Sequence, residues 1–398
     1  MPLAAGGRTR PLPLARLHHA AGWHPAPAHG WTLPLWYEGS GGALEEQIAA
    51  RSGAVICDRS HLGRFYVTGE RAAEALARAL ATDTRRLPAG RVARAAACRD
   101  DGSVLDLPWL WPLEAGRWLV VSGPRAQERL HSRVTAVVSS MGGSGGAPGG
   151  AESEIVLHDR LASTVLLSVQ GPRAAELLAE VVGPTIPQAL APGACRELLL
   201  GGYRAAVARA SEIGEDGYWL LASPEVGEQL WASALAAGVV PAGLSAHDAL
   251  RLEAGVLEAP LELPRPATPE AAGLGTLVHL DAREGLTERD FPGRDALLAE
   301  RAAGGPERRV AALRLAGREP ARPGAPVLAA GEPVGACVAA AYSEALFAPI
   351  ALAYLTAEAL ARPLAIEIGG RHAPAEALPL PLVPPRAGPP HTTAEGAR

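Results

Sequence analysis

The hydrophobic pattern of the chain changes near Arg308, and this change limits the folds that the chain can adopt. Before Arg308, strand-like segments alternate with segments of helical spacing. After it come short alternating apolar segments separated by Gly and Pro, at 310–315, 333–339, 350–354 and 364–368. Short strands joined by turns are typical of a small barrel or sandwich. The sequence therefore predicts an α/β region followed by a separate β domain.

The α/β region contains one order of elements twice. Strands are expected at 63–69, 117–122, 164–170 and 217–222. Helices are expected at 72–80 and 173–182, and from about Pro124 and Pro224. Between the two sets lies a Gly-rich run at 141–150, and such a run is predicted to be a flexible loop. The pattern indicates a weak internal duplication.

All 37 basic residues are arginine, because the sequence contains no lysine. A lysine is needed for the Schiff base to pyridoxal phosphate, for a phosphate-binding P-loop and for attachment of a lipoyl or biotinyl arm. The sequence therefore excludes these uses of the chain. Any swinging carrier must be another protein.

Other chemistries are excluded by charge and spacing. Acidic and basic residues are interspersed, the formal net charge is -5, and no basic tract suits nucleic acid. No segment approaches the roughly 20 apolar residues of a membrane span, and no signal-peptide pattern precedes residue 17. The four cysteines form no C-x-x-C pair. We expect a cytoplasmic protein that binds neither nucleic acid nor membrane.

Five short segments follow one another along the chain. They are Gly30-Trp31 with Leu33-Pro-Leu-Trp-Tyr37, Cys57-Asp-Arg-Ser-His-Leu62, Gly214-Glu-Asp-Gly217, Gly243-Leu-Ser-Ala-His-Asp-Ala-Leu-Arg-Leu-Glu-Ala-Gly255 and Asp290-Phe-Pro-Gly-Arg-Asp-Ala-Leu297. In order and spacing they resemble the glycine-cleavage T-protein, or aminomethyltransferase, family. Each match is short, and the collinear set of five carries the resemblance.

The resemblance implies an α+β fold with two related α/β folate-binding subdomains and a C-terminal β-barrel. It also implies that tetrahydrofolate binds to the α/β part. The expected divisions are an N-terminal lead-in at 1–30, a folate-binding domain at 31–300, a barrel domain at 305–386 and a disordered tail at 387–398.

Asp106 is the catalytic candidate. It ends the segment Asp101-Gly-Ser-Val-Leu-Asp106, which is similar to the family's Gly-Gly-x-x-Asp-Asp, and it matches the first aspartate; the second is Leu107 here. The resemblance implies a carboxylate that orients the folate and stabilises positive charge as it develops on nitrogen. The alternative is a turn residue without a role in chemistry.

Arg94, Trp219 and His247 are the candidates for ligand binding. The family usually has a glutamate at the position of Trp219 and an arginine at that of His247. Loss of both partners of an ion pair together is physically coherent, because losing one alone would leave a buried charge unpaired. Trp219 and His247 then belong to a site remodelled for another planar ligand, or they only fill the core. Arg94 and Arg99 replace uncharged residues of the family, and their charge suits a carboxylate or phosphate.

Several other polar residues are expected to be structural. Glu215 and Asp216 should shape a turn, Asp248, Arg251 and Glu253 should form an intrahelical ion network, and Cys57 with His61 forms no credible dyad. The spacing of His18, His19, His24 and His29 matches no metal motif, so we expect no metal.

Three functions remain open. The first is a transferase that moves a one-carbon unit to tetrahydrofolate from a lipoyl carrier protein or a small methylated amine. The second is a non-catalytic or remodelled scaffold for a different planar ligand or a protein partner. The third is a folate-dependent demethylase or a subunit of an amine oxidase, which would need a partner's flavin because no Gly-x-Gly-x-x-Gly segment is present.

Overall fold

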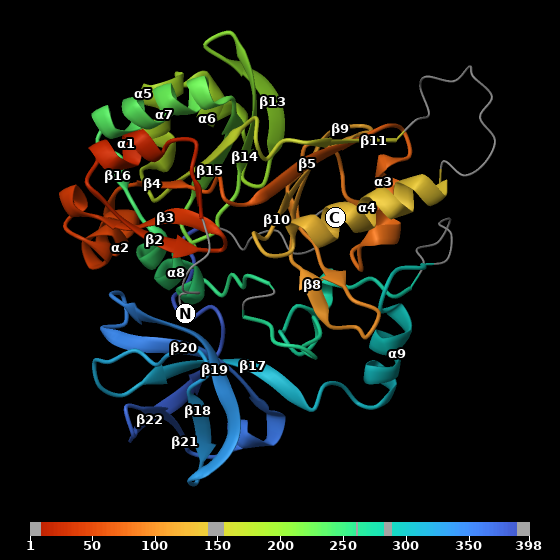
Figure 1. The fold of residues 1–398 in the computed structure, drawn as a ribbon, viewed down its shortest axis with the longest axis vertical. Helices are drawn as coiled ribbons and strands as arrows, with labels where there is room; N and C mark the ends of the chain where they lie inside the picture. Colours follow the sequence, from red (N-terminus) through yellow and green to blue (C-terminus); the bar gives the residue numbers. More distant parts are fainter. Residues whose placement is uncertain (1–8, 142–154, 260–261, 282–288, 388–398) are drawn as a thin grey trace. The chain divides into compact units, whose positions relative to one another are not determined.

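The computed structural model describes residues 9–141, 155–259, 262–281 and 289–387 (Figure 1). The chain divides into two compact units. Within the described residues, the Asp106 unit lies in Leu62–Ala162 and Glu258–Arg309, and the barrel unit lies in Met1–His61, Ser163–Leu257 and Val310–Pro389. The predicted flexible loop beyond Met141 and the predicted tail beyond Ala387 lie outside the described residues.

The Asp106 unit is built on a five-stranded sheet in the order β11-β5-β10-β9-β6. The strands are β11 (Val156–Asp159), β5 (Gly63–Thr68), β10 (Arg117–Ser122), β9 (Trp109–Glu114) and β6 (Ala93–Arg94). Helices α3 (Ala72–Ala79) and α4 (Gln127–Met141) supply Leu76 and Leu130 to a buried core that includes Phe65 and Val120 of the sheet. A small hairpin, β7 (Ala97–Cys98) with β8 (Val104–Asp106), and helix α9 (Arg294–Ala302) complete the unit.

The barrel unit contains a six-stranded sheet in the order β13-β14-β15-β12-β4-β16. The strands are β13 (Cys195–Leu200), β14 (Tyr203–Arg209), β15 (Gly217–Ala222), β12 (Val165–Gln170), β4 (Val55–Asp58) and β16 (Val240–Pro241). Helices α5 (Ala174–Val182) and α7 (Pro224–Ala236) bury Leu177 and Trp231 in a core with Val169 and Leu220 of the sheet. Helix α6 (Thr185–Ala189) follows α5.

Both sheets are connected in the same way. In one, β5 leads to α3, the hairpin of β9 and β10 places β10 antiparallel to β5, and α4 follows. In the other, β12 leads to α5, the hairpin of β14 and β15 places β15 antiparallel to β12, and α7 follows. The repeated order predicted from the sequence is therefore present in the fold.

A closed six-stranded barrel follows, in the order β17-β20-β19-β18-β21-β22 (Figure 1). Its strands are β17 (Arg308–Leu315), β18 (Pro326–Ala329), β19 (Glu332–Ser343), β20 (Ala348–Thr356), β21 (Leu364–Ile368) and β22 (Arg371–Leu378). Leu313, Val327, Leu355 and Ile366 fill its core. Strands β18 and β22 were not predicted, because β18 is only four residues long and β22 alternates alanine with polar residues, without a large apolar side.

The lead-in contains regular structure. Strands β1 (Arg10–Pro11), β2 (Trp23–Ala28) and β3 (Trp31–Tyr37) form a three-stranded sheet, and helix α1 (Ala15–Ala20) lies between β1 and β2 in the sequence. Helices α2 (Ala43–Ser52) and α8 (Leu244–Glu253) pack against β3 and against each other. In the part of the chain that the structure describes, no helix is long and apolar enough to cross a bilayer.

Candidate functional site

Asp106 is the last residue of β8, and its carboxylate is fully engaged by its neighbours. The Ser122 hydroxyl donates to Oδ2 at 2.6 Å, and the Leu107 backbone N–H donates to Oδ1 at 2.8 Å. The Gly123 N–H lies 3.2 Å from Oδ1 and 3.3 Å from Oδ2. Ser122 ends β10, so the carboxylate ties the small hairpin to the main sheet of its unit. The side chain therefore has one fixed orientation.

The protonation of Asp106 is set by burial. Asp106 is 1% exposed, and burial raises the pKa of its carboxyl to about 6, although Ser122 and Gly123 lower it in part. Gly123 must be glycine for this approach, because a Cβ there would lie 2.7 Å from the Ala259 carbonyl oxygen and 2.9 Å from Asp106 Oδ1. A carboxyl with a pKa near 6 can hold or release a proton close to neutral pH.

Arg94 lies in the same unit as Asp106. Its guanidinium lies over the Trp109 ring, 4.8 Å from the centroid, and its positive charge slightly lowers the pKa of Asp106. Arg94 and Trp109 are paired across β6 and β9, so the sheet holds the stack in place. The structure therefore brings two of the four predicted site residues into one electrostatic environment.

Trp219 and His247 belong to the barrel unit, where His247 and the cross-strand neighbour of Trp219 contact the carboxylate of Glu212. Trp219 of β15 pairs across the sheet with Ser168 of β12, and the Ser168 hydroxyl donates to Glu212 Oε1 at 2.6 Å. His247 Nε2, on α8, lies 3.2 Å from Glu212 Oε2. Arg59 Nε lies 3.5 Å from the same oxygen. The four side chains around Glu212 are buried, as is the glutamate itself.

Glu212 is ionised in this setting. Burial raises its pKa, but the charges of His247 and Arg59 and the hydrogen bonds outweigh this and lower the pKa below its usual range. His247 Nδ1 is buried and has no hydrogen-bond partner among the described residues. The histidine thus offers one ring nitrogen that Glu212 does not use.

Sequence reasoning did not identify Glu212, Arg59 or Ser122. Glu212 stands in the loop before β15, two residues ahead of the Gly214-Glu-Asp-Gly217 turn, where no periodic pattern marks it. One signal was available: the acid that the resemblance leads one to expect at position 219 is missing, while the acid Glu212 stands seven positions earlier. Only the fold places that acid beside His247.

The residues predicted to be structural have identified partners. Glu215 pairs with Arg51 at 2.9 Å, and Asp216 pairs with Arg209 at 2.6 Å. Arg251 pairs with Asp248 at 2.9 Å within α8, as predicted. The prediction that Glu253 joins this intrahelical network is wrong, because its carboxylate pairs with Arg51 at 2.6 Å instead.

The histidines and Cys57 are placed in packing roles. His18 Nε2 lies 2.9 Å from Asp58 Oδ2, and the Tyr37 hydroxyl lies 2.9 Å from His18 Nδ1, all buried. His61 stacks on His29, and burial raises the pKa of the Cys57 thiol far above its ordinary value. Among residues 9–141, 155–259, 262–281 and 289–387, no three His, Cys, Asp or Glu side chains are grouped to hold a metal ion.

Comparison with known proteins matches both parts of the chain. Residues 14–282 match the GCVT N-terminal domain family, and residues 308–384 match the glycine cleavage T-protein C-terminal barrel domain. An aminomethyltransferase of Streptomyces coelicolor is 35% identical over 379 residues, which cover 92% of this chain and 95% of the relative. An aminomethyltransferase of Rubrobacter xylanophilus is 32% identical over the full length of both chains.

A solved structure agrees with these matches. The crystal structure of glycine cleavage system aminomethyltransferase T from Bartonella henselae superimposes with a TM-score of 0.83 and 26% sequence identity, covering 95% of this chain and 99% of that one. The resemblance stated from five short motifs and the predicted α+β fold with a terminal barrel are thus confirmed over nearly the whole length. The chain belongs to the aminomethyltransferase family, that of the glycine-cleavage T-protein.

Proposed function

We propose that the protein transfers a one-carbon unit to tetrahydrofolate, and that Asp106 is its catalytic carboxylate. The observation that carries this proposal is the fixed, fully hydrogen-bonded Asp106 at the position of the family's first motif aspartate, with a pKa raised to about 6. Membership of the family supplies the reaction class. The donor is proposed to be a lipoyl carrier protein or a small methylated amine.

Asp106 is proposed to stabilise charge in this reaction. When bound, tetrahydrofolate would supply the two nitrogens that bond to the carbon; with a lipoyl-linked aminomethyl donor, the carbon–nitrogen bond to ammonia and the carbon–sulfur bond to the lipoyl thiol would both break, and ammonia and the free thiol would leave. Positive charge develops on nitrogen during this exchange, and a nearby carboxylate stabilises it. Ser122 and Gly123 hold the Asp106 carboxylate in one orientation, so little reorganisation is needed as the charge appears.

Arg94 is proposed to act on the ligand's anionic part. Its guanidinium is planar and lies over the Trp109 ring, 4.8 Å from the centroid, and this stack limits its orientation. A carboxylate accepts two such donors in parallel. Tetrahydrofolate carries carboxylates on its glutamyl group, so an arginine fits this ligand.

A second candidate function is favoured by Trp219, His247 and Glu212. In the folate-binding members the acid is expected at position 219, whereas here the ionised acid is Glu212 and the buried base is His247. This set contains a buried indole ring and a histidine Nδ1 without a hydrogen-bond partner among the described residues. It supports a scaffold remodelled for a different planar ligand.

Isothermal titration with tetrahydrofolate tests both candidates. The titrated proteins are the wild type, Asp106→Asn, and the control Asp159→Asn, whose exposed carboxylate accepts only the nearby Leu161 N–H among the described residues. If the first candidate holds, the wild type binds, Asp106→Asn weakens binding about tenfold or more, and the control does not. Thermal midpoints of all variants establish that each is folded.

The opposite result also has a defined meaning. Wild-type protein that does not bind tetrahydrofolate contradicts the transferase proposal. If the double variant Trp219→Glu/His247→Arg then gains binding, the remodelled-scaffold function replaces it. Equal binding of tetrahydrofolate by the wild type and Asp106→Asn would show that Asp106 does not contribute to the folate site.

A further inference from the structure

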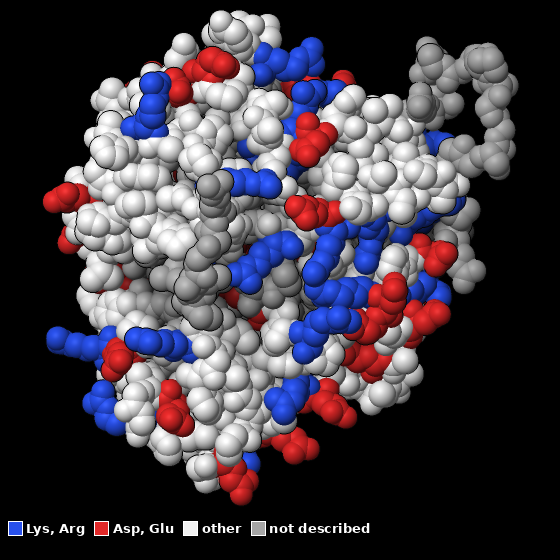
Figure 2. All heavy atoms as spheres, viewed as in Figure 1, with Lys and Arg blue, Asp and Glu red and all other residues white. Residues whose placement is uncertain are grey.

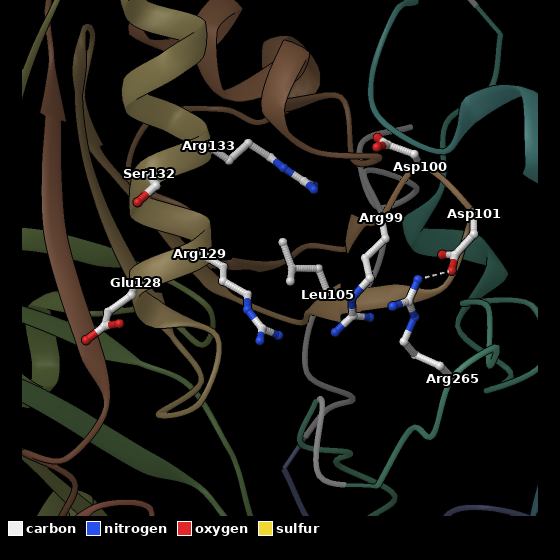
Figure 3. Close-up of a pocket in the computed structure, with 9 residues that line it drawn as sticks. All are labelled: Arg99, Asp100, Asp101, Leu105, Glu128, Arg129, Ser132, Arg133 and Arg265. Atoms are coloured by element: carbon white, nitrogen blue, oxygen red, sulfur yellow. Dashed lines mark hydrogen bonds and ion pairs between the residues drawn. The ribbon is translucent and has the colours of Figure 1, made fainter.

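A separate group of arginines surrounds a cavity in the Asp106 unit. Arg99, Arg129, Arg133 and Arg265 line a cavity of about 920 Å³, with Leu105 of β8 at its wall (Figure 3). Successive side chains of a strand point to opposite faces, so Leu105 faces this cavity while Asp106 faces Ser122. The cavity is therefore distinct from the surroundings of the Asp106 carboxylate.

The arginines come from three segments of the unit. Arg129 and Arg133 are four residues apart on α4 and share one face of that helix, whereas Arg99 follows β7 and Arg265 lies in the segment before α9. Figure 2 shows arginine side chains gathered on the face of the molecule near α4 and β8. Arg129 and Arg265 are exposed, and the other two are half-buried. The unit thus concentrates guanidinium groups that are distant in sequence.

The acids at this cavity neutralise only part of the charge. Asp101 pairs with Arg265 and accepts a hydrogen bond from the Ser103 backbone at 3.0 Å, and Asp100 is turned toward Arg133 (Figure 3). Glu128 points away from the arginines. Its carboxylate therefore offers them no partner.

Arg99 and Arg129 form no ion pair with a carboxylate of the described residues. Arg99 donates to the Val104 carbonyl, which is neutral. Arg129 forms no hydrogen bond or ion pair with another described residue. Burial lowers the pKa of Arg99, and the neighbouring charges of Arg265 and Arg129 lower it further. Like charges held this close repel one another, and an anion between them would relieve the repulsion.

We infer that this cavity binds a small ligand that carries at least two anionic groups, either phosphoryl groups or carboxylates. Guanidinium groups suit both, because their parallel N–H donors match pairs of oxygens. Arg129 and the N–H groups of Arg99 that do not donate to Val104 and Ser103 supply the donors, and Leu105 gives the ligand an apolar wall. The volume lies within the usual range for small-molecule sites, which favours a small ligand over an acidic protein segment.

Titration calorimetry at about 50 mM salt tests the site, because weak screening preserves charge interactions. The probes are inorganic pyrophosphate and citrate, which separate phosphoryl from carboxylate ligands, with acetate as the singly charged comparison. The proteins are the wild type, Arg129→Gln, Arg129→Glu and the control Arg71→Gln. Arg71 is an exposed arginine of the same unit that pairs with Glu74 at 2.9 Å and does not line the cavity.

The expected result is binding of pyrophosphate, citrate or both by the wild type and the control, with much weaker binding of acetate. Arg129→Gln should weaken the binding of pyrophosphate or citrate about tenfold, and Arg129→Glu should abolish that binding. Failure of both probes to bind, or equal binding by all four proteins, overturns the site. Hexaglutamate is titrated as a further probe. If it binds while neither pyrophosphate nor citrate does, the small-ligand site is also overturned, in favour of an acidic peptide partner. None of these readouts depends on one-carbon transfer.

Discussion

At the scale of single residues, burial affects the pKa of the Asp106 carboxyl more strongly than its hydrogen bonds do. Its carboxylate accepts from Ser122, Leu107 and Gly123, which favour the charged form, yet removal from water raises the pKa to about 6. The ordinary value is 3.8. Between these values the folded protein binds more protons at this site than the unfolded chain does, so this group's contribution to stability falls as pH rises.

This sign leads to a prediction for Asp106→Asn, which cannot titrate. Relative to that variant, the free energy of unfolding of the wild type should fall by on the order of 1–3 kcal/mol as the pH rises from about 4 to 6. The thermal midpoint of the wild type should fall with it. Asp101→Asn should show the opposite sign, because the Ser103 and Arg265 hydrogen bonds lower the pKa of Asp101 to about 2. There the wild type gains stability as pH rises between about 2 and 4. Parallel midpoint curves for wild type and Asp106→Asn would contradict the raised pKa.

Glu212 shows how one buried carboxylate can serve several neighbouring side chains. The position of Trp219 carries no acid, but Glu212 reaches His247 at 3.2 Å and Ser168 at 2.6 Å. A buried histidine and arginine without a carboxylate would be costly, and Glu212 removes that cost. His247, Ser168 and Arg59 are therefore connected through one carboxylate.

At the scale of elements, the start of α8 packs directly on the backbone of β3. A Cβ at Gly243 would lie 2.3 Å from the Leu35 carbonyl carbon and oxygen and 2.5 Å from the Trp36 nitrogen. The Glu46 carboxylate accepts the N–H groups of Gly243 and Tyr37, so α2 holds both elements in place. Helix and strand cannot separate without breaking these hydrogen bonds.

Gly243→Ala should therefore destabilise the protein by about 3 kcal/mol, at the upper end of overpacking costs. The backbone of Gly243 has φ -91 and ψ -179, which alanine adopts readily, so the whole cost is steric. Gly39→Ala is the control, because the nearest atom to a Cβ there is 3.9 Å away. Thermal midpoints measure both. A similar loss in the two variants would show that the α8–β3 contact can relax.

At the scale of the whole molecule, Glu253 connects the barrel to the helices of its unit. Its carboxylate pairs with Arg51 of α2 at 2.6 Å and accepts from the Ser343 hydroxyl of β19 at 2.5 Å. Its carbonyl oxygen accepts the N–H of Leu382 at 2.7 Å, beyond the last barrel strand. One buried residue therefore joins three segments that are far apart in sequence.

Glu253→Gln should lower stability by roughly 2–4 kcal/mol, because Arg51 and Ser343 lose a buried charged partner, although Glu215 still neutralises Arg51. Differential scanning calorimetry should show the barrel unfolding at a lower temperature than the rest. Glu74→Gln removes a partly exposed carboxylate that pairs with Arg71 and Arg78, and it should cost less than about 1 kcal/mol. A single, unshifted transition in Glu253→Gln would contradict this connecting role.

The sequence by itself determined the features that depend on local pattern. Alternating apolar residues predicted four of the barrel strands, strand-to-helix transitions predicted the duplicated order, and collinear motifs predicted the family. Period and motif order are properties of neighbouring residues, so they can be recognised without coordinates. Strands β18 and β22 were missed because their local pattern is weak.

Only the tertiary structure decided which polar groups meet. Glu212 and His247 are 35 positions apart, Arg51 and Glu253 are 202 apart, and Arg265 and Asp101 are 164 apart. Ion pairs and buried hydrogen bonds act over a few ångströms, and folding brings such distant positions together without leaving a periodic trace in the sequence. The same holds for the raised pKa of Asp106, because burial is a property of everything packed around the carboxyl.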